Sequence, residues 1–326
     1  MSLSVSFLDI VKAHKNLKGQ VIHTPLISSP ALSAIADADV WMKLECHQKT
    51  GSFKARGALN KIASLTEEEL ARGVITASAG NHAQGVAYAS SLKGASALIV
   101  VPKTAPETKK AGIKRYGAEL VVYGDSYDDA ESHAYELAKE TGRTFVHAFE
   151  DNEIIAGQGT AALEALLEEP DFDVILVPAG GGGLICGVAL AAKAINPDVQ
   201  VIGIQTYASP PWYYSFREKR LAEVVYSDSL ADGLHGGITQ GNLDLALQII
   251  DDFLLVEEEH VAQAMSWLAK EHHLMVEGSG AVGVASLMQG TVPDLEGKKV
   301  LTIVSGSNVD AGKLAEIIGK HAYGIG

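Results

Sequence analysis

The stretch VILVPAGGGGLICGVALAA, residues 174–192, joins a short apolar run, four consecutive glycines and a longer apolar segment. A run rich in β-branched residues that continues through glycine into a helical segment is typical of a strand–turn–helix unit. Pro178 and the glycines would interrupt a membrane helix, so we expect this stretch to lie in a protein core. The N–H groups at the start of the helix would form a cradle suited to phosphate.

The same alternation of strand and helix recurs on both sides of this unit. GVITASAG, ALIVVP, AELVVYG and TFVHAF read as strands with helical segments between them, and VQVIGIQ, FLLV, KKVLTIVSGSN and DVWMKLE read as further strands. Repeated βαβ units form parallel sheets. We therefore predict an α/β fold of two open parallel-sheet domains. The smaller, residues 72–150, is inserted in a larger one made of residues 1–71 and 151–326.

Composition excludes several classes of protein. The 326 residues carry a net charge of −14, which is the wrong sign for a protein that coats nucleic acid. Two cysteines, Cys46 and Cys186, supply neither a disulfide framework nor a zinc site, and we interpret them as buried reduced thiols. The N-terminus reads as an amphipathic helix and not as a secretory signal. We expect a cytoplasmic protein that interacts with neither membranes nor nucleic acid.

The glycine run does not match a nucleotide-binding motif. No frame of residues 180–187 has the GxGxxG spacing, the next strand ends in Gln205 where a dinucleotide site needs an acidic residue, and no GxxxxGK[ST] occurs. The sequence therefore favours a phosphorylated cofactor that is not a dinucleotide. A tight turn without a ligand is the alternative.

Three other segments lie at predicted strand ends or helix starts. KTGSFKARGA, residues 49–58, places Lys54 beside Phe53 at a helix start, where its amine could form a Schiff base; a solvated lysine is the alternative. SAGNHAQG, residues 78–85, could bind a carboxylate or form an ordinary N-cap. SGSN, residues 305–308, offers the Ser305 hydroxyl to a ligand or to its own turn.

Seven segments of the chain together resemble the fold-type II pyridoxal-phosphate enzymes, in that family's order and spacing. They are QKTGSFKARGA, SAGNHAQGVA, IAGQGT, VPAGGGGLI, ADGL, EGSGA and SGSNVD. The resemblance is to the serine/threonine dehydratases, especially the catabolic threonine dehydratases, and to serine racemase. It implies a fold like that of the tryptophan synthase β subunit, pyridoxal 5′-phosphate as cofactor, and a homodimer or homotetramer. It also implies a small amino acid as substrate.

The resemblance assigns roles to single residues. Lys54 would be the catalytic residue that binds the cofactor aldehyde, with Phe53 beneath the ring. The phosphate would be held by Gly180, Gly181, Gly182, Gly183 and Leu184. Other cofactor contacts would come from Asn81 at the ring hydroxyl, Gly233 at the imine side, Glu277 at the ring edge and Ser305 at the ring nitrogen. The substrate carboxylate would lie against Ser78, Ala79, Gly80, Asn81 and His82.

The implied reaction is α,β-elimination. Lys54 would take the substrate Cα proton, the β-hydroxyl would leave, and L-threonine or L-serine would become 2-oxobutyrate or pyruvate plus ammonia. A hydroxyl such as that of Ser305 does not hold a proton on the ring nitrogen as a carboxylate does, which favours elimination over transamination. The chain ends at Gly326, soon after SGSNVD, so we expect no C-terminal regulatory domain and no feedback by isoleucine.

Five positions depart from the family pattern. Ala79 stands where serine racemase has its second, catalytic serine, so we expect elimination with little racemisation. Gln205 and Thr206 replace the carboxylates of the racemase metal site, so we expect no metal there. Phe149 falls where the racemase has a cofactor-contacting Asn, and Gly278 follows Glu277 where Pro is commoner.

Several interpretations stay open at this point. The aromatic stretch 206–220 is either a packed helix or subunit contact, or a lid that shapes substrate choice. Within the fold, an amino-acid racemase, a β-replacement synthase or a dehydratase of another β-hydroxy amino acid such as hydroxyaspartate are alternatives. A non-catalytic binding protein is the alternative from a different class, although Lys54 argues against it.

Overall fold

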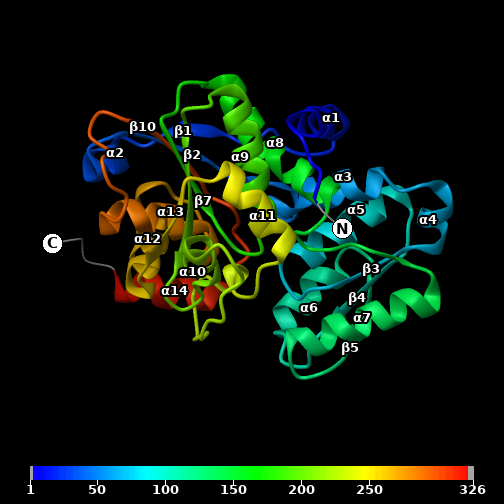
Figure 1. The fold of residues 1–326 in the computed structure, drawn as a ribbon. Coiled ribbons are helices and arrows are strands. Elements are labelled where there is room, and N and C mark those ends of the chain that lie inside the picture. Colours follow the sequence, from blue (N-terminus) through cyan, green and yellow to red (C-terminus); the bar gives the residue numbers. More distant parts are fainter. Residues whose placement is uncertain (1–2, 322–326) are drawn as a thin grey trace.

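The computed structural model describes residues 3–321, in which the strands form two separate sheets (Figure 1). The six strands of the larger sheet, in spatial order, are β1 (Leu26–Ser28), β2 (Asp39–Lys43), β10 (Lys299–Ile303), β7 (Val174–Pro178), β8 (Gln200–Thr206) and β9 (Asp252–Val256). The four strands of the smaller sheet are β5 (Glu119–Val122), β4 (Ala97–Val101), β3 (Val74–Ala77) and β6 (Thr144–Phe145). The predicted fold class is confirmed.

Two details of the sheets differ from the sequence prediction. All strand pairs are parallel except β1 with β2, and the short β1 was not predicted. The predicted strand TFVHAF is wrong beyond Thr144–Phe145. The rest of that segment leaves the sheet as a loop, which brings the Ala148 carbonyl to the amine of Lys54.

Helices cover both faces of each sheet. Packed on one face of the larger sheet are α2 (Pro30–Ala36), α12 (Glu258–Glu271), α13 (Gly278–Gln289) and α14 (Ala311–Lys320). Packed on its other face are α1 (Phe7–Leu17), α8 (Asn152–Glu168), α9 (Gly183–Ile195) and α11 (Gln240–Ile249). The smaller sheet packs against α3 (Lys54–Ala63), α5 (Asn81–Lys93) and α6 (Glu107–Lys114) on one face and α7 (Tyr127–Thr141) on the other. The remaining helices are α4 (Glu67–Arg72), α10 (Pro211–Glu218) and the 3₁₀ turns η1 (Glu45–His47), η2 (Lys49–Gly51) and η3 (Asp232–Leu234).

The apolar runs of the sequence are the central strands of these sheets. Every residue of β7 is buried, and its side chains alternate between two apolar clusters: Val174 and Leu176 face one, Ile175 and Val177 the other. A strand covered on both faces needs this uninterrupted apolar pattern. Within residues 3–321, no helix combines the length and the apolar character that a membrane crossing requires.

The apolar core around the smaller sheet extends beyond the predicted domain boundaries. It includes Leu17 of α1, Leu59 of α3 and Ile154 of α8, all outside residues 72–150. We propose residues 72–150 as the inserted domain on the basis of chain order, because all four strands of the smaller sheet lie within that range.

Helix α13 was not predicted because its sequence has no amphipathic period. Residues 278–287 are all buried, so small and apolar residues cover every side of the helix. The hydrophobic periodicity that identifies a surface helix is therefore missing. The EGSGA motif forms the start of this helix, with Glu277 as its N-cap.

Helix α8, which contains the IAGQGT motif, contacts α3 and α9 through glycine. A Cβ at Gly157 would lie 2.6 Å from the Gly57 Cα of α3, and a Cβ at Gly159 would lie 2.7 Å from the Gly187 carbonyl oxygen of α9. Real Cβ contacts are longer, so these helices approach closely only because the side chains are absent. Helix α8 thereby holds the Lys54 helix and the glycine-loop helix together.

We expect Gly157→Ala to lower the free energy of unfolding by about 1–3 kcal/mol, because the added methyl group has to separate α8 from α3. Urea denaturation measures the change. Gly319→Ala in α14 is the matched control: nothing lies within 4 Å of its added Cβ, so it should leave stability unchanged or raise it by up to about 1 kcal/mol. Equal stability of Gly157→Ala and wild type would contradict the packing argument.

Candidate active site

Lys54 lies at the first position of α3 and is partly buried. Its Nζ donates a hydrogen bond to the Ala148 carbonyl oxygen at 2.8 Å, and the centre of the Phe53 ring lies 5.4 Å away. Burial lowers the pKa of the Lys54 amine from 10.5 to about 8, because the charged form loses solvation. An amine that is partly neutral near physiological pH can act as a nucleophile and as a base.

The loop before Lys54 is supported by the SGSN loop. Thr50 and Gly51 both have positive φ, 61° and 74°, a backbone conformation that a β-branched threonine rarely adopts. Asn308 Nδ2 donates to the Thr50 carbonyl at 2.7 Å, and the Ser307 N–H donates to the Gly51 carbonyl at 2.8 Å. These contacts hold the turn that directs the chain into α3.

The glycine run forms the start of α9 as the sequence indicates. Gly182 is the N-cap, with φ 106°, and no side chain caps the first turn. A Cβ at Gly181 would overlap the Phe149 ring, and one at Gly182 would lie 2.6 Å from the Trp212 ring, so side chains are excluded here. Leu184 lies in the same turn and is buried. Uncapped N–H groups at the positive end of a helix dipole favour an anion.

Three residues outside the predicted motifs hold the glycine loop. Trp212 Nε1 donates to the Gly180 carbonyl at 2.5 Å, and Asn242 Nδ2 donates to the Gly181 carbonyl at 2.6 Å. Gln205 Nε2 donates to the Ala179 carbonyl at 3.1 Å. No local pattern in the sequence pointed to these roles, because each depends on contacts between distant parts of the chain.

Part of the aromatic stretch 206–220 is packed into the protein. Residues 211–218 of this stretch form α10, and the Trp212 side chain is fully buried and stacks on Phe253 with ring centres 5.0 Å apart. Gln205 Oε1 accepts hydrogen bonds from the N–H groups of Trp212 and Tyr213, at 2.9 Å and 3.2 Å. Trp212 therefore fits the packed-helix interpretation and supports the glycine loop, whereas Tyr207 and Tyr214 are exposed.

A second helix start lies at the SAGNHAQG motif. Gly80 is the N-cap of α5, and no side chain caps that turn; Ser78 Oγ accepts a hydrogen bond from the Gly80 N–H at 3.2 Å. Ala79 lies between them, partly exposed. The His82 ring contacts the Val146 carbonyl at 3.1 Å, and burial, followed by the charge of Lys54, lowers its pKa to about 3. His82 is therefore neutral.

Asn81, Glu277 and Asn308 come from three different motifs and form one hydrogen-bonded group. Asn81 Nδ2 donates to Glu277 Oε1 at 2.7 Å, Asn308 Nδ2 donates to Asn81 Oδ1 at 2.7 Å, and the Asn308 N–H donates to Glu277 Oε2 at 3.1 Å. Burial, and then the charge of Asp232, raise the pKa of Glu277 to about 7. The sequence assigned roles to Asn81 and Glu277, whereas Asn308 was identified only as part of the SGSN segment.

The ADGL segment connects the glycine loop to helix α13. The Gly233 N–H donates to Ser279 Oγ at 2.9 Å, and a Cβ at Gly180 would lie 3.1 Å from the Gly233 carbonyl oxygen. Ser305 Oγ contacts the Ser279 carbonyl at 3.4 Å. The neighbouring Asp232 forms an ion pair with Lys109 of α6 at 2.6 Å, which joins η3 to the helices of the smaller sheet.

The structure thus brings the seven motifs into one contiguous region. The Phe53 N–H donates to the Ser305 carbonyl at 3.1 Å, which joins the lysine motif to SGSN. The remaining links are those described above, through Asn308, through Ser279 and through the contact of Gly157 with Gly57. Among residues 3–321, no group of three or more His, Cys, Asp or Glu side chains is arranged to hold a metal ion.

Comparisons with known proteins agree with this arrangement. A family model described as pyridoxal-phosphate dependent enzyme matches residues 17–306. An L-threonine ammonia-lyase of Thermotoga maritima is 43% identical over 320 residues, covering 97% of this chain and 79% of that protein. A catabolic L-threonine dehydratase of Staphylococcus aureus is 41% identical over 325 residues, covering 98% of this chain and 94% of that protein.

Solved structures with the same fold include a racemase and a deaminase. Maize serine racemase superposes with a TM-score of 0.92 at 34% sequence identity, covering 98% of both chains. Threonine deaminase isoform 2 from Solanum lycopersicum superposes with a TM-score of 0.89 at 31% identity, covering 98% of this chain and 96% of that one.

We expect Trp212→Phe to weaken the binding of pyridoxal phosphate. The phenyl ring keeps the stacking on Phe253 but loses the hydrogen bond to Gly180, and a bond of about 0.5–1.5 kcal/mol corresponds to an affinity about 2- to 12-fold lower. Titration of the cofactor-free chain, followed by absorbance, measures the affinity. Trp267→Phe in α12 is the control and should bind normally. An equal loss in both variants would show that Trp212 has no specific role at the loop.

Proposed function

The chain belongs to the family of pyridoxal-phosphate dependent enzymes, and we propose that it is an L-threonine ammonia-lyase that also accepts L-serine. The observation that carries this proposal is the Lys54 amine, with its pKa lowered to about 8, in the same region as two helix starts whose first turns no side chain caps. One of these is suited to a phosphate and the other to a substrate carboxylate.

The residues present fit the cofactor. Any larger residue in place of these glycines would put its side chain into the loop that must hold the phosphate, since Gly181 and Gly182 have no room for a Cβ. We propose that this loop and Leu184 bind the phosphate, and that Lys54 binds the aldehyde. Phe53, Asn81, Gly233, Glu277 and Ser305 would surround the ring. When bound, pyridoxal phosphate supplies an electron sink that stabilises a carbanion at the substrate Cα.

The chain's own residues then carry the acid–base steps. The carboxylate of the amino acid binds at the start of α5, against residues 78–82, where backbone N–H groups and the helix dipole favour an anion. Lys54, neutral in part near pH 7, removes the Cα proton. Loss of the β-hydroxyl as water and hydrolysis of the released enamine give 2-oxobutyrate from threonine, or pyruvate from serine, and one ammonia.

Ala79 favours elimination over racemisation. Inversion at Cα requires one base on each face of the substrate, and Lys54 supplies the base on one face. The methyl group of Ala79, which lies in the carboxylate-binding loop, cannot accept or donate a proton. Serine racemases share the fold. Because Ala79 supplies no second base, we propose that this chain releases keto acids instead of the D-amino acid.

We further infer that the enzyme acts in the cytoplasm and assembles as a homodimer or homotetramer. The family resemblance supports both statements, and the catabolic dehydratase of S. aureus, 94% of which this chain covers, supports a role in amino-acid breakdown.

We expect the loaded enzyme to convert L-threonine to 2-oxobutyrate and L-serine to pyruvate. Lys54→Ala should lower kcat by at least about 1,000-fold and abolish the visible absorbance of the lysine-bound cofactor. A keto-acid assay over a panel of β-hydroxy amino acids, with spectra of both proteins, measures this; Lys103→Ala on the surface is the control. A strong preference for β-hydroxyaspartate would redirect the assignment, and a chain without bound chromophore would indicate a binding protein.

We expect Ala79→Ser to raise the ratio of D-serine to pyruvate formed from L-serine, because the added hydroxyl supplies a second acid–base group. Chiral chromatography of the products measures the ratio. Ala79→Gly changes the size of the side chain without adding a hydroxyl and should keep the wild-type ratio. If Ala79→Ser also keeps the wild-type ratio, the absence of a second base does not explain the elimination.

A further inference from the structure

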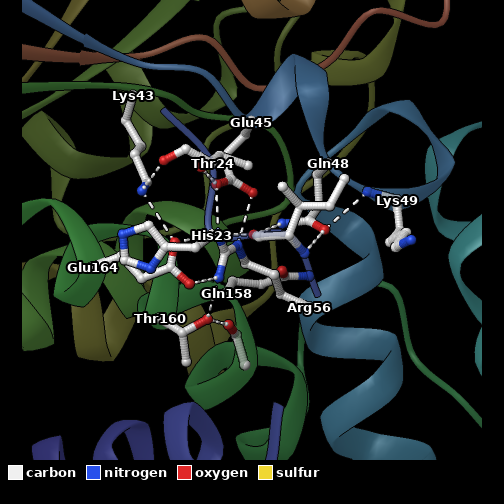
Figure 2. A network of polar contacts seen from close by, with 12 residues as sticks. His23, Thr24, Lys43, Glu45, Gln48, Lys49, Arg56, Gln158, Thr160 and Glu164 are labelled. Atoms are coloured by element: carbon white, nitrogen blue, oxygen red, sulfur yellow. Dashed lines mark hydrogen bonds and ion pairs between the residues drawn. The ribbon is translucent and has the colours of Figure 1, made fainter. Parts of the chain in front are cut away.

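Two residues after Lys54, the Arg56 side chain lies in a fully buried cluster of four charges. Figure 2 shows its guanidinium between the carboxylates of Glu45 and Glu164, with Lys43 beside Glu164. The exposed fraction of these four side chains is between 0% and 3%. Lys43 is the last residue of β2, Glu45 lies two residues after it, and Glu164 lies on α8. The cluster therefore joins α3 to two elements of the larger sheet's layer.

All five N–H groups of the guanidinium have an acceptor. Nε and Nη2 each lie 2.8 Å from a different oxygen of Glu45, and Nη1 and Nη2 each lie 2.7 Å from a different oxygen of Glu164. Nη1 also donates to Thr160 Oγ1 at 3.2 Å. Two bidentate carboxylate pairs on one planar fork fix both the position and the orientation of the guanidinium.

A buried charge cluster of this kind contributes little net free energy to folding. Removing four charges from water costs several kcal/mol per ion, and apolar replacements of buried ion clusters are often as stable or more stable. The charges of the two carboxylates and the two cations sum to zero, so the cluster does not change the net charge of the region around Lys54. The cluster instead fixes the position and orientation of helix α3.

The packing of α3 shows why that geometry is needed. Its backbone meets that of α8 at Gly57 and Gly157. Polar contacts through single donor atoms also join the two helices: the Gly57 N–H donates to Gln158 Oε1, Asn60 Nδ2 donates to Glu153, and Lys61 Nζ pairs with Asp151. The Arg56 guanidinium differs from these because its two bidentate pairs fix an orientation as well as a distance. Residues 54 and 56 are separated by about 200° around a helix, so a side chain fixed at one position sets the direction of the other. Arg56 points to the cluster, and Lys54 points away from it, to the Ala148 carbonyl.

We propose that Arg56 is a positioning residue for Lys54: its fork, held by Glu45 and Glu164, fixes the rotation and the axial position of α3 and thereby the place of the lysine amine. This inference rests on the proposed function, in which Lys54 is the cofactor-binding base. Arg56 itself touches neither cofactor nor substrate, because its five donors are used within the cluster.

Arg56→Lys is the test, because it keeps the charge and most of the volume but replaces the fork by a single ammonium. In the loaded enzyme, we expect kcat for L-threonine to fall by about 10- to 100-fold, with KM changed by less than about 3-fold, since a displaced base impairs the chemical step more than binding. In the cofactor-free full chain, we expect the pKa of Lys54 to rise from about 8 toward its ordinary 10.5, as water reaches the amine. Labelling by reductive methylation at several pH values measures it.

Lys61→Met is the matched control. Lys61 also lies on α3 and forms an ion pair at 2.6 Å with Asp151, the N-cap of α8, so this variant removes a charge contact between the same two elements. It should lower the melting temperature but leave both kcat and the pKa of Lys54 at wild-type values. Glu45→Gln breaks the cluster from the other side and should reproduce the effects of Arg56→Lys, which keeps the test valid if that variant fails to fold.

The outcomes separate this inference from the function on which it rests. If the folded Arg56→Lys and Glu45→Gln variants keep wild-type kcat and a Lys54 pKa of about 8, Arg56 is only a structural residue and the inference is wrong. If Lys61→Met changes both quantities equally, the effect is general loosening of α3 and the inference is also wrong. A wild-type chain that binds no pyridoxal phosphate would instead overturn the proposed function.

Discussion

A guanidinium held by two buried carboxylates is the interaction on which the arrangement of this protein depends. Arg56 connects α3, which begins with the reactive lysine, to Glu45 after β2 and to Glu164 on α8. Because α8 also contacts α9 through Gly159, one helix sets the position of both the lysine and the glycine loop. A shift of α8 would therefore move both parts of the proposed cofactor site together.

The site is formed by backbone as much as by side chains. Helices α5 and α9 both begin with a glycine N-cap and without a side-chain cap, which leaves N–H groups at two positive helix ends. Most helices satisfy these groups with a Ser, Thr, Asp or Asn of their own. Without a side-chain cap, each of these two helices has unpaired N–H groups in its first turn, which destabilises it in isolation. An anionic ligand can bind these groups and offset that cost, and a glycine N-cap leaves room for such a ligand.

Asn81 of α5 and Lys109 of α6, on helices beside the smaller sheet, make polar contacts with the part of the chain around the larger sheet. Asn81 contacts Glu277 and Asn308, and Lys109 contacts Asp232. Both lie beside the proposed site, and the charge of Asp232 contributes to the raised pKa of Glu277. The protonation of this buried carboxyl near neutral pH is thus coupled to how the two parts meet.

The sequence alone determined the fold class, the parallel strands and the motifs, because an uninterrupted apolar strand, a glycine turn and a lysine at a helix start are local patterns with local physical causes. It did not reveal α13, whose all-round burial removes the periodic signal, or the end of β6 after Phe145. Only the tertiary structure showed that Trp212 and Asn308 support the loops and that Arg56 joins three elements. Those roles arise from contacts between residues far apart in the chain, which no local pattern encodes.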